Sequence, residues 1–182
     1  MSVHCISIHK QETWHAQHSS CKELFFITNF VSMTLMELPK RVVLASDHAG
    51  LNLKEHVKKY FTKKGIDIID VGTFSDKSVD YPEIIRKGCS AVLEQDCFGF
   101  IFGGSGNGEA MVANKVPGIR AALVYSEETA NLARAHNDAN VMSLGGRLTT
   151  SKEAEKFIDT FLTTPFDSGR HQQRVDAIEI PS

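Results

Sequence analysis

The chain reads FGFIFGGSGNGE from Phe98 to Glu109, an apolar run followed by a turn with four glycines in six positions. The run predicts a buried strand over 98–102, and 109–115 is compatible with a helix. Glycines let backbone N–H groups approach an anion closely, and the start of a helix adds partial positive charge. The turn therefore predicts an anion cradle, in which Glu109 is placed to act as a base beside a stabilised oxyanion.

Three common glycine motifs do not fit this turn. A Walker A loop ends in Gly-Lys-Ser/Thr, whereas this turn ends in Gly-Glu-Ala. A dinucleotide fingerprint requires glycine where Glu109 stands, and a nucleophile elbow centred on Ser105 requires glycine where Asn107 stands. Nucleotide binding and serine-hydrolase chemistry therefore lose support. A plain tight turn, with Ser105 capping the helix, remains an alternative.

The alternation of strand and helix continues on both sides of the turn. Short apolar runs predict strands at 41–46, 66–71, 119–125 and 140–144, and apolar spacing or caps predict helices at 51–64, 80–94, 126–136 and 150–164. In 51–64 the apolar residues share one side and the lysines the other. Right-handed crossovers then give an α/β, doubly wound, Rossmann-like fold: a five-stranded parallel sheet flanked by helices.

Ligands of such sheets bind beyond the carboxyl ends of the strands. Four groups are predicted there: Asp47-His48, the glycine turn with Glu109, Tyr125-Ser126, and Gly145-Gly146-Arg147.

Composition and charge exclude several classes of function. The 182 residues are 42% hydrophobic and 23% charged, as in one soluble globular domain with a sizeable core. A net charge of −2 argues against a nucleic-acid or membrane surface, and no run is long enough to span a membrane. The four cysteines form no Cys-x-x-Cys pair, which predicts reduced thiols and a cytoplasmic protein.

The first forty residues differ from the rest. They hold four of the eight histidines, contain no glycine and show no periodicity. A signal or transit peptide fits poorly, because acids accompany the lysines and no arginine precedes Arg41. We expect residues 1–40 to be a non-core extension and 41–182 to be the functional domain. One explanation is an upstream start choice, with Met33 or Met36 as the natural start; adventitious metal binding by the four histidines is an alternative.

Two polar pairs follow predicted elements. Asp47 and His48 can reach a ligand after the first strand, although Asp47 could simply cap a helix with His48 exposed. His136 and Asn137 end a helix, and an imidazole can act as an acid or base near neutral pH. The alternative there is a C-cap with Asn137 in the left-handed conformation.

Arginines supply the candidate phosphate ligands, because the planar guanidinium group suits bidentate contacts. These candidates are Arg147, Arg170 and Arg174, with His171 beside them. Arg170 and Arg174 share one face if their segment is helical, and a solvated basic patch is the alternative. Tyr81 either touches a ligand or packs.

Taken together, these motifs resemble the type B ribose-5-phosphate isomerases and the related galactose-6-phosphate isomerases, over about residues 41–178. The matching pieces, in order, are SDHAG (46–50), DYP (80–82), GGSGNGE (103–109), ANK (113–115), GIRA (118–121), HND (136–138), GGR (145–147) and RHQQR (170–174). The resemblance implies an aldose–ketose isomerase of the pentose phosphate pathway, working through a cis-enediolate with no metal or organic cofactor.

The resemblance also implies the base. One branch of the family uses a cysteine at the start of the glycine turn, where this chain has Gly103, and the other uses a glutamate after the turn, here Glu109. Ser105 would contact the reacting oxygens. Further substrate contacts would come from Tyr81, Gly104, Gly106, Asn107 and Gly108.

Other roles follow from the same resemblance. His136, helped by Asp47, would open the furanose ring, and Asn137 would hold substrate hydroxyls. The phosphate would be bound by His48, Arg147, Arg170 and Arg174, with His171 nearby. The family builds its site between two subunits, so a homodimer is implied, with a tetramer as the alternative. An isomerase of a tetrose or hexose phosphate stays open, as does a non-catalytic sugar-phosphate-binding protein, which would need the arginines but not the base.

Overall fold

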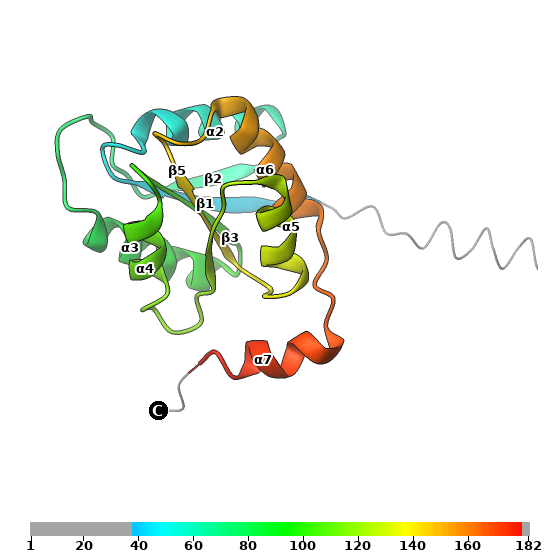
Figure 1. Ribbon diagram of the computed structural model, residues 1–182. Coiled ribbons are helices and arrows are strands. Elements are labelled where there is room, and N and C mark those ends of the chain that lie inside the picture. The colour runs from blue at the N-terminus through cyan, green and yellow to red at the C-terminus, as the bar shows by residue number, and fades with distance from the viewer. Residues whose placement is uncertain (1–37, 180–182) are drawn as a thin grey trace, which may run out of the picture. The chain divides into compact units, whose positions relative to one another are not determined.

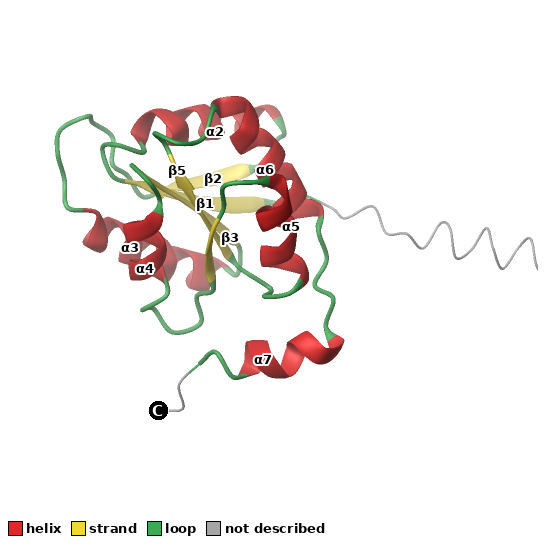
Figure 2. Cartoon of the chain, in the orientation of Figure 1, coloured by secondary structure: helices red, strands yellow, loops and turns green. Residues whose placement is uncertain are grey.

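A computed structural model describes residues 38–179 of the chain as a parallel sheet covered by helices on both faces (Figure 1). The predicted extension, with its four histidines, lies outside the described residues except for its last three positions. Figure 2 shows strands and helices alternating along the chain. The elements are β1 (Arg41–Ser46), α2 (Leu51–Lys63), β2 (Asp67–Asp70), α3 (Tyr81–Gln95), β3 (Phe98–Gly103), α4 (Asn107–Ala113), β4 (Ala121–Leu123), α5 (Glu127–Ala135), β5 (Val141–Gly145), α6 (Ser151–Thr163), a 3-10 turn (Gly169–His171) and α7 (Gln172–Asp176).

The sheet has five parallel strands in the order β2-β1-β3-β5-β4, which confirms the predicted fold class. Successive residues of a strand face opposite sides, so Val42 and Leu44 pack with α2, α5 and α6, while Val43 and Ala45 pack with α3 and α4. Both faces are therefore buried, as parallel sheets require. The chain leaves β1 toward β2 on one side of the sheet and leaves β3 toward β4 on the other side. This change of direction creates a switch point between the carboxyl ends of the neighbouring strands β1 and β3.

The expectation that the lysines of α2 all face solvent is wrong for Lys54. Its side chain is fully buried, and its ammonium donates to Asp70 Oδ1 at 2.7 Å and to the Thr73 carbonyl at 2.9 Å. Burial opposes the charge on Asp70, but hydrogen bonds from Lys54 and Lys58 outweigh it, and the pKa of Asp70 is lowered. Lys54 thus ties α2 to the loop that follows β2.

Two elements differ from their expected bounds by more than one residue. The helix after the glycine turn begins at Asn107 rather than at Glu109, because Gly106 starts it in the left-handed conformation with φ of 78°. Strand β4 is shorter than 119–125, because side chains accept hydrogen bonds from the backbone N–H groups on both sides of it. Asn140 Oδ1 accepts from the N–H of Arg120 before the strand, and Thr129 Oγ1 accepts from those of Tyr125 and Ser126 after it.

The caps also show one difference. Thr150 caps α6 as expected. At the end of α5 the left-handed residue is Asp138 rather than Asn137, so the C-cap alternative is wrong in that detail. No helix within residues 38–179 is long and apolar enough to cross a membrane.

Candidate functional site

The turns after β1, β3 and β5 interlock at one edge of the sheet. The N–H of Gly146 donates to the Gly103 carbonyl at 2.7 Å, and the N–H of Arg147 donates to the Gly104 carbonyl at 3.1 Å. A Cβ on Gly50 would overlap the Phe102 carbonyl, so the β1 turn can approach β3 only as glycine. The three turns therefore form one platform at the switch point of the sheet.

A cavity of about 390 Å³ opens on this platform. It is lined by Asp47, Tyr81, Gly104, Ser105, Gly108, Glu109, Arg147 and Leu148. Three of the four groups predicted at the carboxyl edge thus meet, and the fourth does not: Tyr125 is 72% exposed, and Ser126 caps α5.

Glu109 lies in this cavity with only 4% of its surface exposed. Its carboxyl group occupies the space beside Gly103 that any side chain there would need, because a Cβ built on Gly103 overlaps it. Burial raises the pKa of Glu109, the nearby Asp47 raises it further, and a hydrogen bond to its own backbone opposes the change. A carboxylate with a raised pKa is better matched to proton transfer near neutral pH.

The glycine turn is held by a hydrogen bond from the neighbouring strand β5. The hydroxyl of Ser143 in β5 donates to the Gly106 carbonyl at 2.7 Å. The N-cap residue of α4 is Gly106 rather than Ser105, and Ser105 Oγ accepts a hydrogen bond from the N–H of Asn107 at 3.4 Å. The turn is therefore fixed by the sheet, and the hydroxyl of Ser105 borders the cavity.

The residues after β1 combine a structural and a site role. Asp47 Oδ1 accepts from the N–H of Gly50 at 2.8 Å and the residue also lines the cavity. His48 is half-buried rather than exposed, and its Nδ1 accepts from the N–H of Val79 at 3.3 Å. The Tyr81 hydroxyl lies 2.6 Å from the position of a Cβ on Gly108, so it covers the turn from the α3 side.

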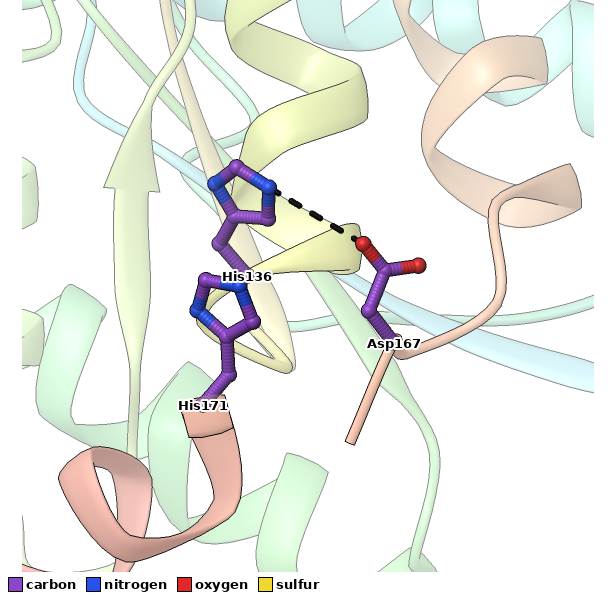
Figure 3. Close-up of side chains that lie close together, drawn as sticks. All are labelled: His136, Asp167 and His171. Carbon is purple, nitrogen blue, oxygen red and sulfur yellow. Dashed lines mark ion pairs between the residues drawn. The ribbon is translucent and has the colours of Figure 1, made fainter. Parts of the chain in front are cut away.

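A second group of predicted residues gathers elsewhere. The rings of His136 and His171 stack with centroids 4.3 Å apart and planes within 7°, and Asp167 Oδ2 lies 3.9 Å from His136 Nε2 (Figure 3). Arg170 Nε donates to His171 Nε2 at 3.3 Å. The Arg170–Arg174 segment is helical, since a 3-10 turn leads into α7.

The two groups lie at opposite edges of the sheet. Helix α5 starts after the carboxyl end of β4 and runs back, so His136 lies just before the amino end of β5. The turn with Glu109 follows the carboxyl end of β3, and five residues of strand span about 17 Å. Within one chain the cavity is thus not lined by His136, Asn137, Arg170, His171 or Arg174.

One cluster in the described part of the chain has the side-chain types that bind metals: His136, Asp167 and His171, whose ligand atoms lie within 4.8 Å of one another. It suits a cation poorly. The stacked rings do not converge on a point. The positive charges of Arg170 and Arg174 act on His171 and oppose the entry of a further cation.

Neither the second cavity nor the two described cysteines offer a base beside an anion-binding turn. A larger hollow of about 580 Å³ lies at the opposite edge, where β1, β2 and β3 begin, away from Glu109. Burial raises the pKa of the Cys89 thiol to about 11, and neither Cys89 nor Cys97 lines the glycine-turn cavity. Sequence reasoning missed Asp167, which belongs to no motif; the only signal was an acidic residue just before the RHQQR segment.

Comparisons with known proteins place this geometry in a family. Residues 42–178 match the model of the Ribose/Galactose Isomerase family. The chain is 47% identical over 141 residues to ribose-5-phosphate isomerase B of Mycolicibacterium paratuberculosis, covering 76% of this chain and 89% of the relative. The corresponding Mycobacterium tuberculosis protein is 43% identical over 141 residues, covering 76% and 87%.

Solved structures agree with the sequence relatives. The ribose 5-phosphate isomerase of Thermotoga maritima superposes with a TM-score of 0.75 at 46% identity, covering 76% of this chain and 97% of that one. Ribose-5-phosphate isomerase B of Mycoplasma genitalium, solved with bound ribulose-5-phosphate, gives a TM-score of 0.73 at 39% identity, covering 78% and 95%. With a matched fold and a glutamate in the glycine-turn cavity, this chain belongs to the ribose/galactose isomerase family.

Proposed function

We propose that this protein interconverts ribose 5-phosphate and ribulose 5-phosphate, an aldose–ketose isomerisation of the pentose phosphate pathway. The observation that carries the proposal is the buried carboxyl group of Glu109, set against Gly103 in a cavity floored by a glycine turn. Relatives in the same family carry the name ribose-5-phosphate isomerase B, and one structure holds ribulose-5-phosphate.

The reaction requires one base and one oxyanion site. Glu109 removes the proton from C2 of the open-chain aldose, and the electron pair moves through C1 to the carbonyl oxygen to give the cis-enediolate. Backbone N–H groups of the turn, 104–108, stabilise that negative charge. Glu109 then returns the proton to C1 as O2 becomes the ketone oxygen, and Ser105 serves as the group that passes protons between O1 and O2. The step is redox-neutral overall, and no outside oxidant or reductant is needed.

Ring opening and phosphate binding are assigned to a second copy of the chain. The cavity contains two acidic residues, Asp47 and Glu109, against one arginine, Arg147. A sugar phosphate brings further negative charge, so one chain offers too little positive charge to hold it. The second copy would supply Arg170 and Arg174.

The remaining roles belong to the same proposal. His136 lies at the far edge of its own sheet and is half-exposed, so it is free to enter the cavity of a partner and open the furanose ring. Asn137 follows it and would hold hydroxyl groups, while His48 stays near the phosphate of its own site. A homodimer with two shared sites results, and a tetramer of two such dimers is the alternative.

Two other functions fit less well. A tetrose or hexose phosphate would use the same base and turn, but the relatives reported above are named for ribose 5-phosphate. A sugar-phosphate-binding protein would need the arginines, but it would not need a carboxylate buried at a cost to stability.

The deciding test is an assay of ketose formation in EDTA with ribose 5-phosphate, allose 6-phosphate and galactose 6-phosphate. We expect turnover of the pentose, reduced by about 10²–10⁴-fold in Glu109→Gln because a general base is lost. Glu128→Gln, the same change at an exposed position of α5, is the matched control. Turnover of a hexose alone would change the assigned substrate, and an unaffected Glu109→Gln would remove Glu109 as the base.

A further inference from the structure

The stacked pair of histidines has an internal asymmetry. His171 is buried, whereas the side chain of His136 is 38% exposed. Two parallel rings with centroids 4.3 Å apart cannot both carry a positive charge without strong repulsion. One ring of the pair must therefore remain neutral when the other is charged.

His171 is the neutral ring by two criteria. Its Nε2 accepts the N–H of Arg170 at 3.3 Å, and a nitrogen that accepts a hydrogen bond carries no proton. Burial lowers the pKa of His171, the positive charges of His136, Arg170 and Arg174 lower it further, and only Asp167 opposes them. A neutral ring stacked on its neighbour offers a flat surface for packing, but it carries no charge that would bind a phosphate.

Asp167 completes the arrangement at the edge of the other ring. Its N–H donates to the Ala135 carbonyl at 2.9 Å, which fixes the residue to the end of α5, directly before His136. Its carboxylate lies 3.9 Å from His136 Nε2. The other carboxylate near this end of the helix, Asp138, is held by Arg120 at 2.9 Å and by Arg134 at 2.7 Å. Asp167 is thus the carboxylate available to His136.

We propose that His171 is a neutral stacking platform for His136 rather than a phosphate ligand, and that Asp167 anchors the edge of the same ring. Both are positioning residues: they hold His136 in the orientation in which it reaches the site of a second copy. The inference rests on the proposed function for its kinetic consequence, but the stack itself can be tested without any activity.

The discriminating variants are His171→Phe and His171→Ala in the full chain. Phenylalanine keeps a flat ring and removes both nitrogens, whereas alanine removes the platform. We expect ribose 5-phosphate turnover within about threefold of the parent for His171→Phe, since a stacked ring remains. We expect a loss on the order of tenfold to a hundredfold in kcat for His171→Ala, since a misplaced catalytic group costs about that much. The open-chain ketose, which needs no ring opening, should be affected less.

Inorganic phosphate is the probe for the competing role. If His171 is a stacking platform, the inhibition constant of phosphate stays unchanged in both variants. If His171 binds the phosphate, that constant rises equally in both. Asp167→Asn should lower the aldose rate, and Asp167→Glu should restore it. Equal loss in His171→Phe and His171→Ala, with weaker phosphate inhibition, would overturn the proposal.

The proton resonances of the His136 ring give a readout that does not depend on catalysis. Stacking on His171 shifts them by ring current, so the shift should persist in His171→Phe and vanish in His171→Ala. His56, which pairs with Glu155 at 2.8 Å away from this cluster, should not move in either variant. Absence of the shift in the parent protein would refute the stack, and a stack present in a protein without isomerase activity would instead remove the proposed function.

Discussion

The overlap between Gly103 and Glu109 predicts that two bases exclude each other at this site. The Glu109 carboxyl group fills the space of any side chain at position 103. Gly103→Cys alone must therefore push that carboxyl group aside by more than an ångström. A shift of that size costs about 100-fold in rate, which corresponds to about 2.7 kcal/mol of transition-state stabilisation.

Glu109→Ala alone removes the base and should cost about 10²–10⁴-fold. If the two changes acted independently, the double variant would lose the product of both factors. The structure predicts the opposite, because alanine at 109 vacates the space into which a cysteine at 103 would project. A thiolate there would take over proton transfer, as it does in the cysteine branch that the family resemblance implies.

The assay is initial-rate turnover of ribose 5-phosphate by the two single variants and the double variant, with folding checked by circular dichroism. We expect the double variant to exceed Gly103→Cys by at least about tenfold. That rate is about 10³-fold or more above the product of the two single losses, an interaction of about 4 kcal/mol or more. The control is Gly103→Ser with Glu109→Ala, which fills the same space without a thiol and should stay inactive. Losses that simply multiply would show that Glu109 does not occupy this space, and the steric argument would be refuted.

Three further outcomes follow from the described contacts. Mixing Glu109→Gln with His136→Ala subunits, each inactive alone, should restore about a quarter of the parent activity, because half the dimers then hold one intact site; no recovery after verified subunit exchange would contradict the shared site. Glu109→Gln should raise the melting temperature near pH 8, since a raised pKa in the folded protein means that the ionised carboxylate destabilises the fold. The gain should shrink as the pH falls from the raised pKa toward 4.5, the ordinary value, and should be absent below it; a gain unchanged at pH 3 would exclude this origin. Lys54→Met should lower the free energy of unfolding in urea by about 3 kcal/mol, against about 1 kcal/mol or less for the partly exposed Lys58→Met; equal losses would mean that burial of Lys54 does not matter.

The alternation of apolar runs and helical spacing was enough to predict five strands and the parallel sheet. It could not predict the strand order, since which strand pairs with which depends on packing across the whole sheet. It also misjudged Lys54, because a helical pattern places every lysine on the polar side and does not reveal the buried carboxylate of Asp70. Local caps such as Thr150 were predictable because they depend only on neighbours in the chain.

The candidate site was predictable to a different degree. Residues that follow the carboxyl ends of strands, such as Asp47 and Arg147, were correctly expected to meet at one edge. The separation of His136 from them follows from the direction of α5, which the sequence pattern implies but does not measure. The stack of His136 on His171 and the position of Asp167 beside it depend on how the chain after α6 returns to α5, and no sequence spacing encodes that return.

Placing the proposed halves of one site at opposite edges of a sheet has a genetic consequence. A chain altered at either Glu109 or His136 spoils only one of the two sites in a dimer with a normal chain, so such an allele would be partly recessive. A chain altered at both positions supplies a defective half to each site. Every mixed dimer would then have two inactive sites, and the doubly altered allele would act dominantly over the normal one.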